Sequence, residues 1–417
     1  MTAPDVAKNR EANPSRSFGG QSASAWHDRF LWMTHAVCDE EFLRRALDLA
    51  REGIALASPN PYVGAVIVDS KGGIAGAGAY TYDGVKHAEI LALEQAGNKA
   101  RAGTLYINLE PHAHQGRTRP CTDALIEAGI SRVVACMADP NPKVSGRGFE
   151  QLRAAKIQVE IGQFEKEARQ LNEAFARYIR HRTPLVTLKS AMTLDGKIAA
   201  APSRATHHQR GMPPGGWITG ELARAHVQEQ RHESDAILTG VGTVLADDPL
   251  LTDRTGQQRR RTLLRVVLDS HLRLPLDSRL VQSVANGAGK NEALVFCSAP
   301  EERKKRELEA HGIRIEHLPR GADGRPDLRA IMRRLGELEI TSVMIESGAT
   351  LNAAALASDI VDKVFFYYAP KIFGQGSVPF AASLSLSWKT RTLRNVRLHH
   401  CGEDVAMEGY LRDPYTE

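Results

Sequence analysis

The segment His87-Ala88-Glu89, followed by Glu110-Pro111-His112 and then by Cys121, decides the fold of the first half of the chain. Side chains two positions apart on a regular helix point about 200° away from each other, so His87 and Glu89 can share a site only where a helix begins. The turn-forming residues 83–86 predict such a beginning. Position 112 follows a predicted strand, and Cys121 starts the next predicted helix. We therefore expect an α/β layer with these side chains gathered in one place.

These side chains are of the types that hold zinc. Zinc in enzymes is commonly bound by three protein ligands, with a fourth position open to water that becomes nucleophilic at neutral pH. We expect His87, His112 and Cys121 to be the ligands, because the start of a helix also favours the thiolate form of a cysteine. Glu89 is the candidate proton carrier. This arrangement is the outline of a hydrolytic nucleobase deaminase.

Position 112 departs from that outline, which has a thiolate where this chain has His112. Histidine is itself a good zinc ligand, so a His-His-Cys set is chemically sensible. Because a neutral imidazole would replace an anionic thiolate, we expect the metal to be more electropositive, and its bound water more acidic, than in a site with cysteine at position 112. Two alternatives stay open. A shift in register would make His114 the ligand, and a domain without activity could keep the same outline, although it would be expected to lose Glu89 or Cys121 as well.

Composition restricts the class of protein. A chain of 417 residues is long enough for two domains, and its 42% hydrophobic and 25% charged content is that of a globular protein. No apolar run approaches the roughly 20 residues that cross a bilayer. With 6% aromatic residues and a net charge of +5, a nucleic-acid-binding protein is disfavoured, whereas the small positive excess suits an anionic metabolite or simply reflects solvated side chains. Five widely spaced cysteines indicate reduced thiols and a cytoplasmic location.

The patterns divide the chain into three parts. Residues 1–38 are polar and are predicted to be a disordered extension, in which Met33 is an alternative start. Residues 39–182 are predicted to form a three-layer α/β domain, and residues 183–417 repeat the β/α alternation as a different domain. Predicted strands are 63–68, 104–109, 132–136, 185–191, 236–239, 264–269, 293–297, 313–317, 341–346 and 363–369, and predicted helices begin near 39, 88, 121, 165, 221, 301, 327 and 350, the one from 165 running unbroken to 181.

Further motifs accompany the zinc-ligand pattern along the chain. In the first domain they are Ser58-Pro59-Asn60-Pro61-Tyr62-Val63-Gly64, Gly116-Arg117-Thr118-Arg119-Pro120-Cys121 and Asp139-Pro140-Asn141-Pro142. In the second they are Ala191-Met192-Thr193-Leu194-Asp195-Gly196-Lys197, Trp217-Ile218-Thr219, Asp235-Ala236-Ile237 and Gly242-Thr243-Val244-Leu245-Ala246-Asp247-Asp248-Pro249. Together they resemble the bifunctional riboflavin-biosynthesis deaminase-reductase family from about residue 39 to the end, in the family's order, and this combination is highly specific.

The resemblance implies an N-terminal cytidine-deaminase-like domain of three α/β/α layers and a C-terminal dihydrofolate-reductase-like α/β domain. The first would use zinc to deaminate 2,5-diamino-6-ribosylamino-4(3H)-pyrimidinone 5′-phosphate. The second would use NADPH to reduce the ribosyl chain, giving 5-amino-6-(5-phosphoribitylamino)uracil. The implied partner is a small phosphorylated pyrimidine, with no nucleic acid and no membrane, and the expected assembly is a homo-oligomer. The alternative function is that of a reductase alone, with a deaminase domain retained for structure.

The resemblance also implies roles for single residues. It makes His87, position 112 and Cys121 the zinc ligands and Glu89 the general acid and base, although the family has Cys where this chain has His112. The residues implied to line the NADPH site are Ala191, Trp217, Thr243, Asp247 and Gly348. Those implied to meet the substrate are Arg231, Leu251, Arg254 and Glu346, of which the two arginines suit a phosphate.

Without the resemblance, the second domain would be harder to interpret. Gly240-Val241-Gly242 lacks the third glycine of the dinucleotide fingerprint. Gly348-Ala349-Thr350 is explained either as an ordinary strand-to-helix turn or as a helix start that binds a cofactor phosphate. Lys189 and Asp195 are explained nearly as well by an ordinary surface ion pair. Gly215-Gly216 departs from the family pattern, and we expect one contact to a substrate hydroxyl to be missing there.

Overall fold

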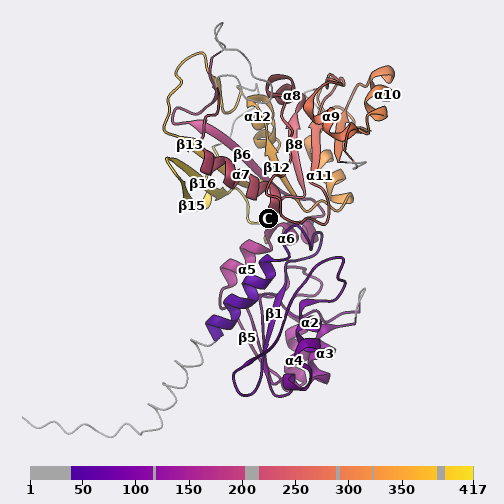
Figure 1. Ribbon diagram of the computed structural model, residues 1–417, viewed down its shortest axis with the longest axis vertical. Helices are drawn as coiled ribbons and strands as arrows, with labels where there is room; N and C mark the ends of the chain where they lie inside the picture. Colours follow the sequence, from indigo (N-terminus) through magenta and orange to yellow (C-terminus); the bar gives the residue numbers. More distant parts are fainter. Residues whose placement is uncertain are drawn as a thin grey trace, which may run out of the picture.

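The computed structural model of the protein describes residues 39–115, 119–201, 216–287, 292–321, 324–382 and 390–416. The predicted extension 1–38 with Met33, and Gly116-Arg117-Thr118 and Gly215 of the motifs above, lie outside these ranges. The described chain forms two α/β domains, one above the other in Figure 1. No helix in the described ranges is long and apolar enough to span a bilayer.

The N-terminal domain is built on a five-stranded sheet in the order β2-β1-β3-β4-β5. Its strands are β1 (Gly64–Val68), β2 (Ile74–Ala79), β3 (Thr104–Ile107), β4 (Arg132–Ala135) and β5 (Gln158–Ile161). Its helices are a first helix over residues 39–51, α2 (Ala88–Ala96), the short η1 (Gly97–Ala100), α3 (Cys121–Glu127), α4 (Arg147–Ala154), α5 (Glu165–Leu171) and α6 (Glu173–His181). β2 runs antiparallel to β1, and β1 runs antiparallel to β3, whereas β3, β4 and β5 are parallel.

The alternation of apolar side chains along β1 explains why helices cover both faces of this sheet. Ala65 and Ile67 pack with residues of α2, α3 and α4, while Val66 and Val68 pack with the helix over 39–51 and with Ala168 of α5. Successive side chains of a strand point to opposite faces, so a strand that is apolar at every position must be covered on both. The predicted three-layer domain is confirmed.

Two glycines of β2 allow α2 to approach the sheet closely. A Cβ at Gly76 would lie 2.1 Å from the backbone oxygen of Ala92, and one at Gly78 would lie 2.5 Å from that of Ala88. Any side chain larger than hydrogen would therefore push α2 outward. Since His87 and Glu89 stand at the start of α2, these glycines help to set the position of the site.

The C-terminal domain contains a nine-stranded sheet in the order β11-β10-β9-β8-β12-β6-β13-β16-β15. Its strands are β6 (Leu185–Thr193), β8 (Ala236–Gly240), β9 (Leu264–Leu268), β10 (Ala293–Cys297), β11 (Arg314–His317), β12 (Ser342–Glu346), β13 (Lys363–Ala369), β15 (Arg394–Cys401) and β16 (Asp404–Tyr410). β16 runs antiparallel to both of its neighbours, β13 and β15, and the other neighbouring strands of this sheet are parallel to each other. A separate small sheet pairs β7 (Lys197–Ala199) with β14 (Val378–Pro379).

Helices cover both faces of the large sheet. They are α7 (Glu221–Glu233), α8 (Val241–Asp247), α9 (Arg279–Ala285), α10 (Glu302–Ala310), α11 (Leu328–Glu337) and α12 (Ala349–Ala357). α11 and α12 share one core cluster with the sheet, and α8, α9 and α10 share another on the opposite face. α7 packs by Ala223 and Val227 against Phe365 and Tyr367 of β13. The sheet therefore presents its carboxyl ends, with the starts of α8 and α12, as one open edge.

The predicted single helix over 165–181 was wrong, because Asn172 separates α5 from α6. Its side-chain oxygen accepts a hydrogen bond from the Tyr62 amide (2.8 Å), and its side-chain nitrogen donates to the Tyr62 carbonyl (3.1 Å). The interruption thus ties these helices to the loop that precedes β1. The sequence patterns also failed to predict the helices η1, α4, α8 and α9 and the strands β2, β5, β7, β14, β15 and β16.

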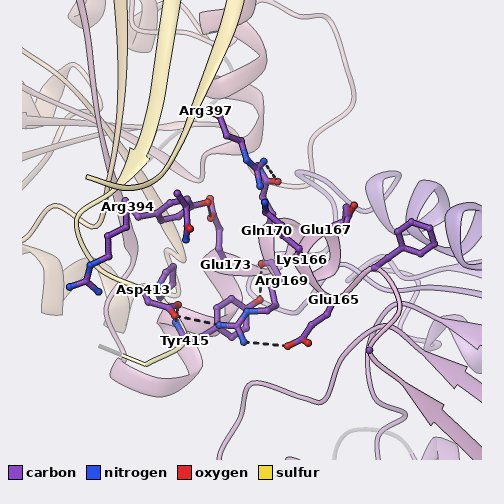
Figure 2. Close-up of a pocket in the computed structure, with 15 residues that line it drawn as sticks. Glu165, Lys166, Glu167, Arg169, Gln170, Glu173, Arg394, Arg397, Asp413 and Tyr415 are labelled. Carbon is purple, nitrogen blue, oxygen red and sulfur yellow. Dashed lines mark hydrogen bonds and ion pairs between the residues drawn. The ribbon is translucent and has the colours of Figure 1, made fainter. Parts of the chain in front are cut away.

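The two domains are in contact through several segments. α6 ends at His181 and β6 begins at Leu185, so the predicted boundary at 182/183 lies in the link between them. A cavity of about 770 Å³ is lined by α5 together with β15, β16 and the C-terminal residues (Figure 2). There Arg169 pairs with Glu165 and Asp413 and lies 3.9 Å from the centre of the Tyr415 ring. The C-terminal segment therefore returns to pack against the N-terminal domain.

Candidate active sites

His87, His112 and Cys121 come together in the N-terminal domain. Their ligand atoms all lie within 4.8 Å of one another. His87 caps the start of α2, Cys121 is the first residue of α3, and His112 follows the end of β3. The His87 Nδ1 and Cys121 Sγ atoms are 3.2 Å apart, and the His87 and His112 ring centres are 5.0 Å apart. The structure thus gathers the predicted ligands at one point.

The donor atoms fit a zinc ion. His112 Nδ1 is buried and finds no hydrogen-bond partner in the described part of the chain, so a metal ligand role would satisfy this polar atom. Burial, together with His87 and His114, lowers the pKa of His112 to about 4, so the ring is in its neutral, ligating form. His114 is exposed and stands outside the group of three, although its ring packs edge-on against that of His112.

Glu89 lies beside these ligands. It is in the first turn of α2, and its side chain is buried. Burial raises the pKa of the Cys121 thiol, and the neighbouring Glu89 carboxylate raises it further. A bound cation would reverse this effect, because a coordinating thiol is deprotonated. A carboxylate next to the metal group, and not part of it, is placed to carry protons.

The loop that carries His112 is held by Glu110. Its buried carboxylate accepts hydrogen bonds from the backbone amides of Asp139 (2.9 Å), Gly146 (2.8 Å) and Gly148 (2.8 Å). A Cβ at Gly148 would lie 2.2 Å from the Pro111 carbonyl oxygen, so only glycine allows this approach. The sequence patterns predicted no role for Glu110, whose partners lie 29, 36 and 38 residues away. Its position between a predicted strand and a predicted ligand was the available signal.

The nine residues predicted for the reductase site line one cavity of about 380 Å³ in the C-terminal domain. They are Ala191, Trp217, Thr243, Asp247 and Gly348, implied for the cofactor, and Arg231, Leu251, Arg254 and Glu346, implied for the substrate. The cavity lies at the carboxyl end of the sheet, beside the starts of α8 and α12. In open α/β sheets this edge is where ligands bind.

A buried charge network forms the floor of this cavity. Arg231 donates to both oxygens of Glu346 (2.8 and 3.0 Å) and to the Thr252 carbonyl (2.9 Å). Lys189 Nζ lies 3.4 Å from the same carboxylate. Burial alone would raise the pKa of Glu346, but Arg231 and Lys189 outweigh it and lower the pKa to about 2. The explanation of Lys189 and Asp195 as an ion pair was wrong, since Lys189 is paired with Glu346.

Asp195 instead organises a loop next to the cavity. Its carboxylate accepts hydrogen bonds from the Thr193 hydroxyl (2.5 Å) and from the amides of Phe373 (3.1 Å) and Gly374 (2.8 Å). These contacts, with burial opposing them, lower its pKa to about 2. The loop they hold runs toward β14, whose Val378 lines the cavity.

A second cavity of about 870 Å³ continues from the first, sharing Gly242, Thr243, Gly348 and Val378 with it. A Cβ at Gly242 would meet no atom within 4 Å, so this backbone faces open space. The start of α12, at Gly348, supplies amides that suit a phosphate. Two joined cavities with a helix start between them fit a dinucleotide such as NADPH.

Sequence reasoning missed several residues on the wall of the first cavity. Arg224 and Gln228 line it together with Arg231, and the three stand at positions i, i+4 and i+7 of α7. That helical spacing was the signal that could have found them. Arg224 also donates to the Thr219 carbonyl (2.8 Å) and lies 5.2 Å from the centre of the Trp217 ring, so it supports that side chain.

Comparisons with known proteins match both domains. Residues 36–137 match the family described as cytidine and deoxycytidylate deaminase zinc-binding region, and residues 184–407 match the RibD C-terminal domain. The riboflavin biosynthesis protein RibD of Aquifex aeolicus is 37% identical over 88% of this chain and 97% of its own length. That of Escherichia coli is 40% identical over 81% and 89%.

Solved structures that cover about nine tenths of the chain give the same result. RibD of Acinetobacter baumannii superposes with a TM-score of 0.74 and 32% identity, covering 89% of this chain and 98% of that one. A Thermotoga maritima protein, named as a diaminohydroxyphosphoribosylaminopyrimidine deaminase and 5-amino-6-(5-phosphoribosylamino)uracil reductase, has a TM-score of 0.74 and 35% identity, covering 90% and 99%.

Fold, sites and matches together define a two-domain enzyme, with a zinc-dependent cytidine-deaminase-like domain followed by an NADPH-dependent reductase domain of the dihydrofolate-reductase-like class. The chain belongs to the RibD family of riboflavin biosynthesis proteins. It is therefore a bifunctional enzyme of riboflavin biosynthesis, and nothing in the fold or the matches favours a reductase alone.

Proposed function

We propose that this chain deaminates 2,5-diamino-6-ribosylamino-4(3H)-pyrimidinone 5′-phosphate and then reduces the ribosyl chain of the product to give 5-amino-6-(5-phosphoribitylamino)uracil. The observation that carries the proposal is the group of His87, His112 and Cys121 beside a buried Glu89, in a chain whose other domain has a reductase cavity. The pair of activities named for the Thermotoga relative supports the same two steps.

In the first step, His87, His112 and Cys121 would hold the metal, which supplies a Lewis acid that makes water nucleophilic at neutral pH. Glu89 would accept a proton from the attacking water and deliver it to the amine nitrogen of the pyrimidine. A C–O bond forms at the ring carbon, the C–N bond breaks, and ammonia leaves. Glu110 would keep His112 in place through its three amide contacts.

In the second step, the C-terminal cavity would hold NADPH, which would supply the hydride that reduces the ribosyl chain at the sugar C1, with a proton from solvent reaching the nitrogen. Ala191, Trp217, Thr243, Asp247 and Gly348 would bind the cofactor, and Leu251 would pack against the substrate. Arg231 is already engaged by Glu346 and Thr252, so its main role would be to orient that carboxylate. Arg254, which lines the same cavity, would bind the phosphate.

The replacement of Glu89 by Gln tests the assignment, because the two half-reactions have separate readouts. Ammonia release from the diamino substrate should fall on the order of 10²- to 10⁴-fold. NADPH oxidation with the deaminated intermediate should stay at the wild-type rate. Ammonia release at the wild-type rate by Glu89→Gln would show that Glu89 is not the proton carrier. A wild-type enzyme that oxidises NADPH but releases no ammonia would establish the reductase-only alternative.

We also propose a setting for the enzyme. The predicted domains, 39–182 and 183–417, would each carry one site, and the protein would act in the cytoplasm, since Cys121, Cys136, Cys297 and Cys401 are buried free thiols. A homo-oligomer is supported by the outer edge of β15, where Val396 and Leu398 are 48% and 60% exposed. Sedimentation of the full chain tests the assembly; a single monomeric species at micromolar concentration would contradict it.

A further inference from the structure

Two neighbouring segments, residues 55–62 and 80–82, lie next to the predicted zinc ligand His87 and are here called the wall. Asn60 Nδ2 donates to the Tyr80 hydroxyl (2.6 Å), and the Tyr82 amide donates to the Leu56 carbonyl (3.1 Å). The Tyr80 ring in turn packs edge-on against the ring of His87, with centres 5.5 Å apart. A displacement of residues 55–62 would therefore be transmitted through Tyr80 to the ligand His87.

The other domain holds this wall through Arg260. The Arg260 amide donates to the Ala55 carbonyl (3.0 Å), and its guanidinium donates to the Ser58 carbonyl (2.6 Å). The same guanidinium lies 4.0 Å from the centre of the Tyr82 ring. One side chain of the C-terminal domain thus joins both segments of the wall, by a charge-assisted hydrogen bond to one and a cation–π contact to the other.

Ser58 is fixed by further contacts from the C-terminal domain. Its hydroxyl donates to Asp235 Oδ2 (2.7 Å) and accepts from Arg261 (3.2 Å), and the residue is buried. Arg261 also donates to the Glu339 carbonyl (2.9 Å), so it is anchored in its own domain. The C-terminal domain therefore holds the wall by the side chains of Arg260, Arg261 and Asp235, and the chemistry of neither site explains these contacts.

We propose that Arg260 is a positioning residue for the deamination: the reductase domain, through Arg260, holds the wall of the deaminase site in its working geometry. This inference rests on the proposed function of that site. It implies that the deaminase half of the enzyme depends on the docked reductase half, whereas the reductase half does not depend on Arg260, which is absent from the lining of its cavity.

The test uses the full chain with three variants, Arg260→Ala, Arg260→Lys and Arg303→Ala. Arg303 is an exposed arginine of the same domain whose ion pairs in the described part of the chain are with Glu301 and Glu307, and it serves as the matched control. Arg260→Ala should lower kcat/KM for ammonia release about tenfold or more, with zinc content and NADPH oxidation of the deaminated intermediate unchanged. Arg260→Lys keeps a donor for Ser58 but loses the planar contact with Tyr82, so it should recover part of the rate.

Hydrogen exchange on the same proteins gives a readout that does not need deaminase activity. Amides of residues 55–62 and 80–87 should exchange faster in Arg260→Ala than in wild type and Arg303→Ala. Unchanged exchange there, ammonia release within twofold of wild type, or an equal fall of both activities would overturn the proposal. A wild-type enzyme that released no ammonia would defeat the proposed function, while faster exchange in Arg260→Ala would still support the role of Arg260 in holding the wall.

Discussion

Replacing Glu346 by Gln should destabilise the C-terminal domain by more than a surface substitution could. Glu346 lies at the end of β12, and its side chain is 13% exposed. It is the common partner of Arg231 and Lys189, which are themselves 10% and 13% exposed. The amide of glutamine keeps the shape but removes the negative charge, so two nearly buried cations lose their counterion.

The expected loss of unfolding free energy in Glu346→Gln follows from two independent arguments. The pKa of Glu346 falls from 4.5 to about 2 on folding, and that difference corresponds to about 3 kcal/mol. Removal of one partner of a buried ion pair costs about 3–5 kcal/mol in other proteins. Because the folded pKa lies below the unfolded one, this stabilisation is complete above about pH 4.5 and is lost as the pH falls through about 2.

Thermal unfolding at neutral pH measures the change. For a domain of this size, about 3 kcal/mol corresponds to a fall in Tm of roughly 6–12 °C. The control is Glu337→Gln, since Glu337 forms an exposed pair with Arg334 at 2.8 Å and should contribute under about 1 kcal/mol. A loss of stability in Glu346→Gln no larger than in Glu337→Gln would refute the argument that the network is a buried one.

Three more outcomes follow from the geometry of the sites. Gly148→Ala would place a Cβ 2.2 Å from the Pro111 carbonyl, so it should reduce ammonia release but not NADPH oxidation, whereas Gly73→Ala, with its nearest neighbour at 3.6 Å, should leave both rates unchanged. Removal of metal by a chelator should stop ammonia release but leave NADPH oxidation unchanged, and added zinc should restore ammonia release. Ammonia release that persists without metal would contradict the zinc site. Arg254→Gln should raise KM for the phosphorylated reductase substrate by about 10- to 100-fold, and an equal effect on the dephosphorylated compound would argue against a phosphate contact.

Much of the fold could be predicted because local pattern and tertiary environment agree. β1 is apolar at each of its positions, and the structure buries both of its faces. The start of α2 at Ala88 followed from the need for His87 and Glu89 to face one point. The structure also brings together the three predicted ligands and, in one cavity, the nine predicted reductase residues.

The rest depends on contacts that a local pattern does not contain. β2, with the sequence Ile-Ala-Gly-Ala-Gly-Ala, has little strand propensity and exists because α2 packs against its glycines. β15 is largely exposed and basic, as an edge strand can be. The pairing of Lys189 with Glu346 joins residues 157 positions apart, so the nearer Asp195 was the natural but wrong partner.

We propose that His112 replaces a thiolate as zinc ligand and that the deamination chemistry is retained. The direct measurement is zinc content and ammonia release of the wild type beside His112→Cys and His112→Ala. We predict about one zinc per chain and clear ammonia release for the wild type and His112→Cys, with loss of both for His112→Ala. Full zinc content and full ammonia release in His112→Ala would show that His112 is not a ligand and would make His114 the candidate.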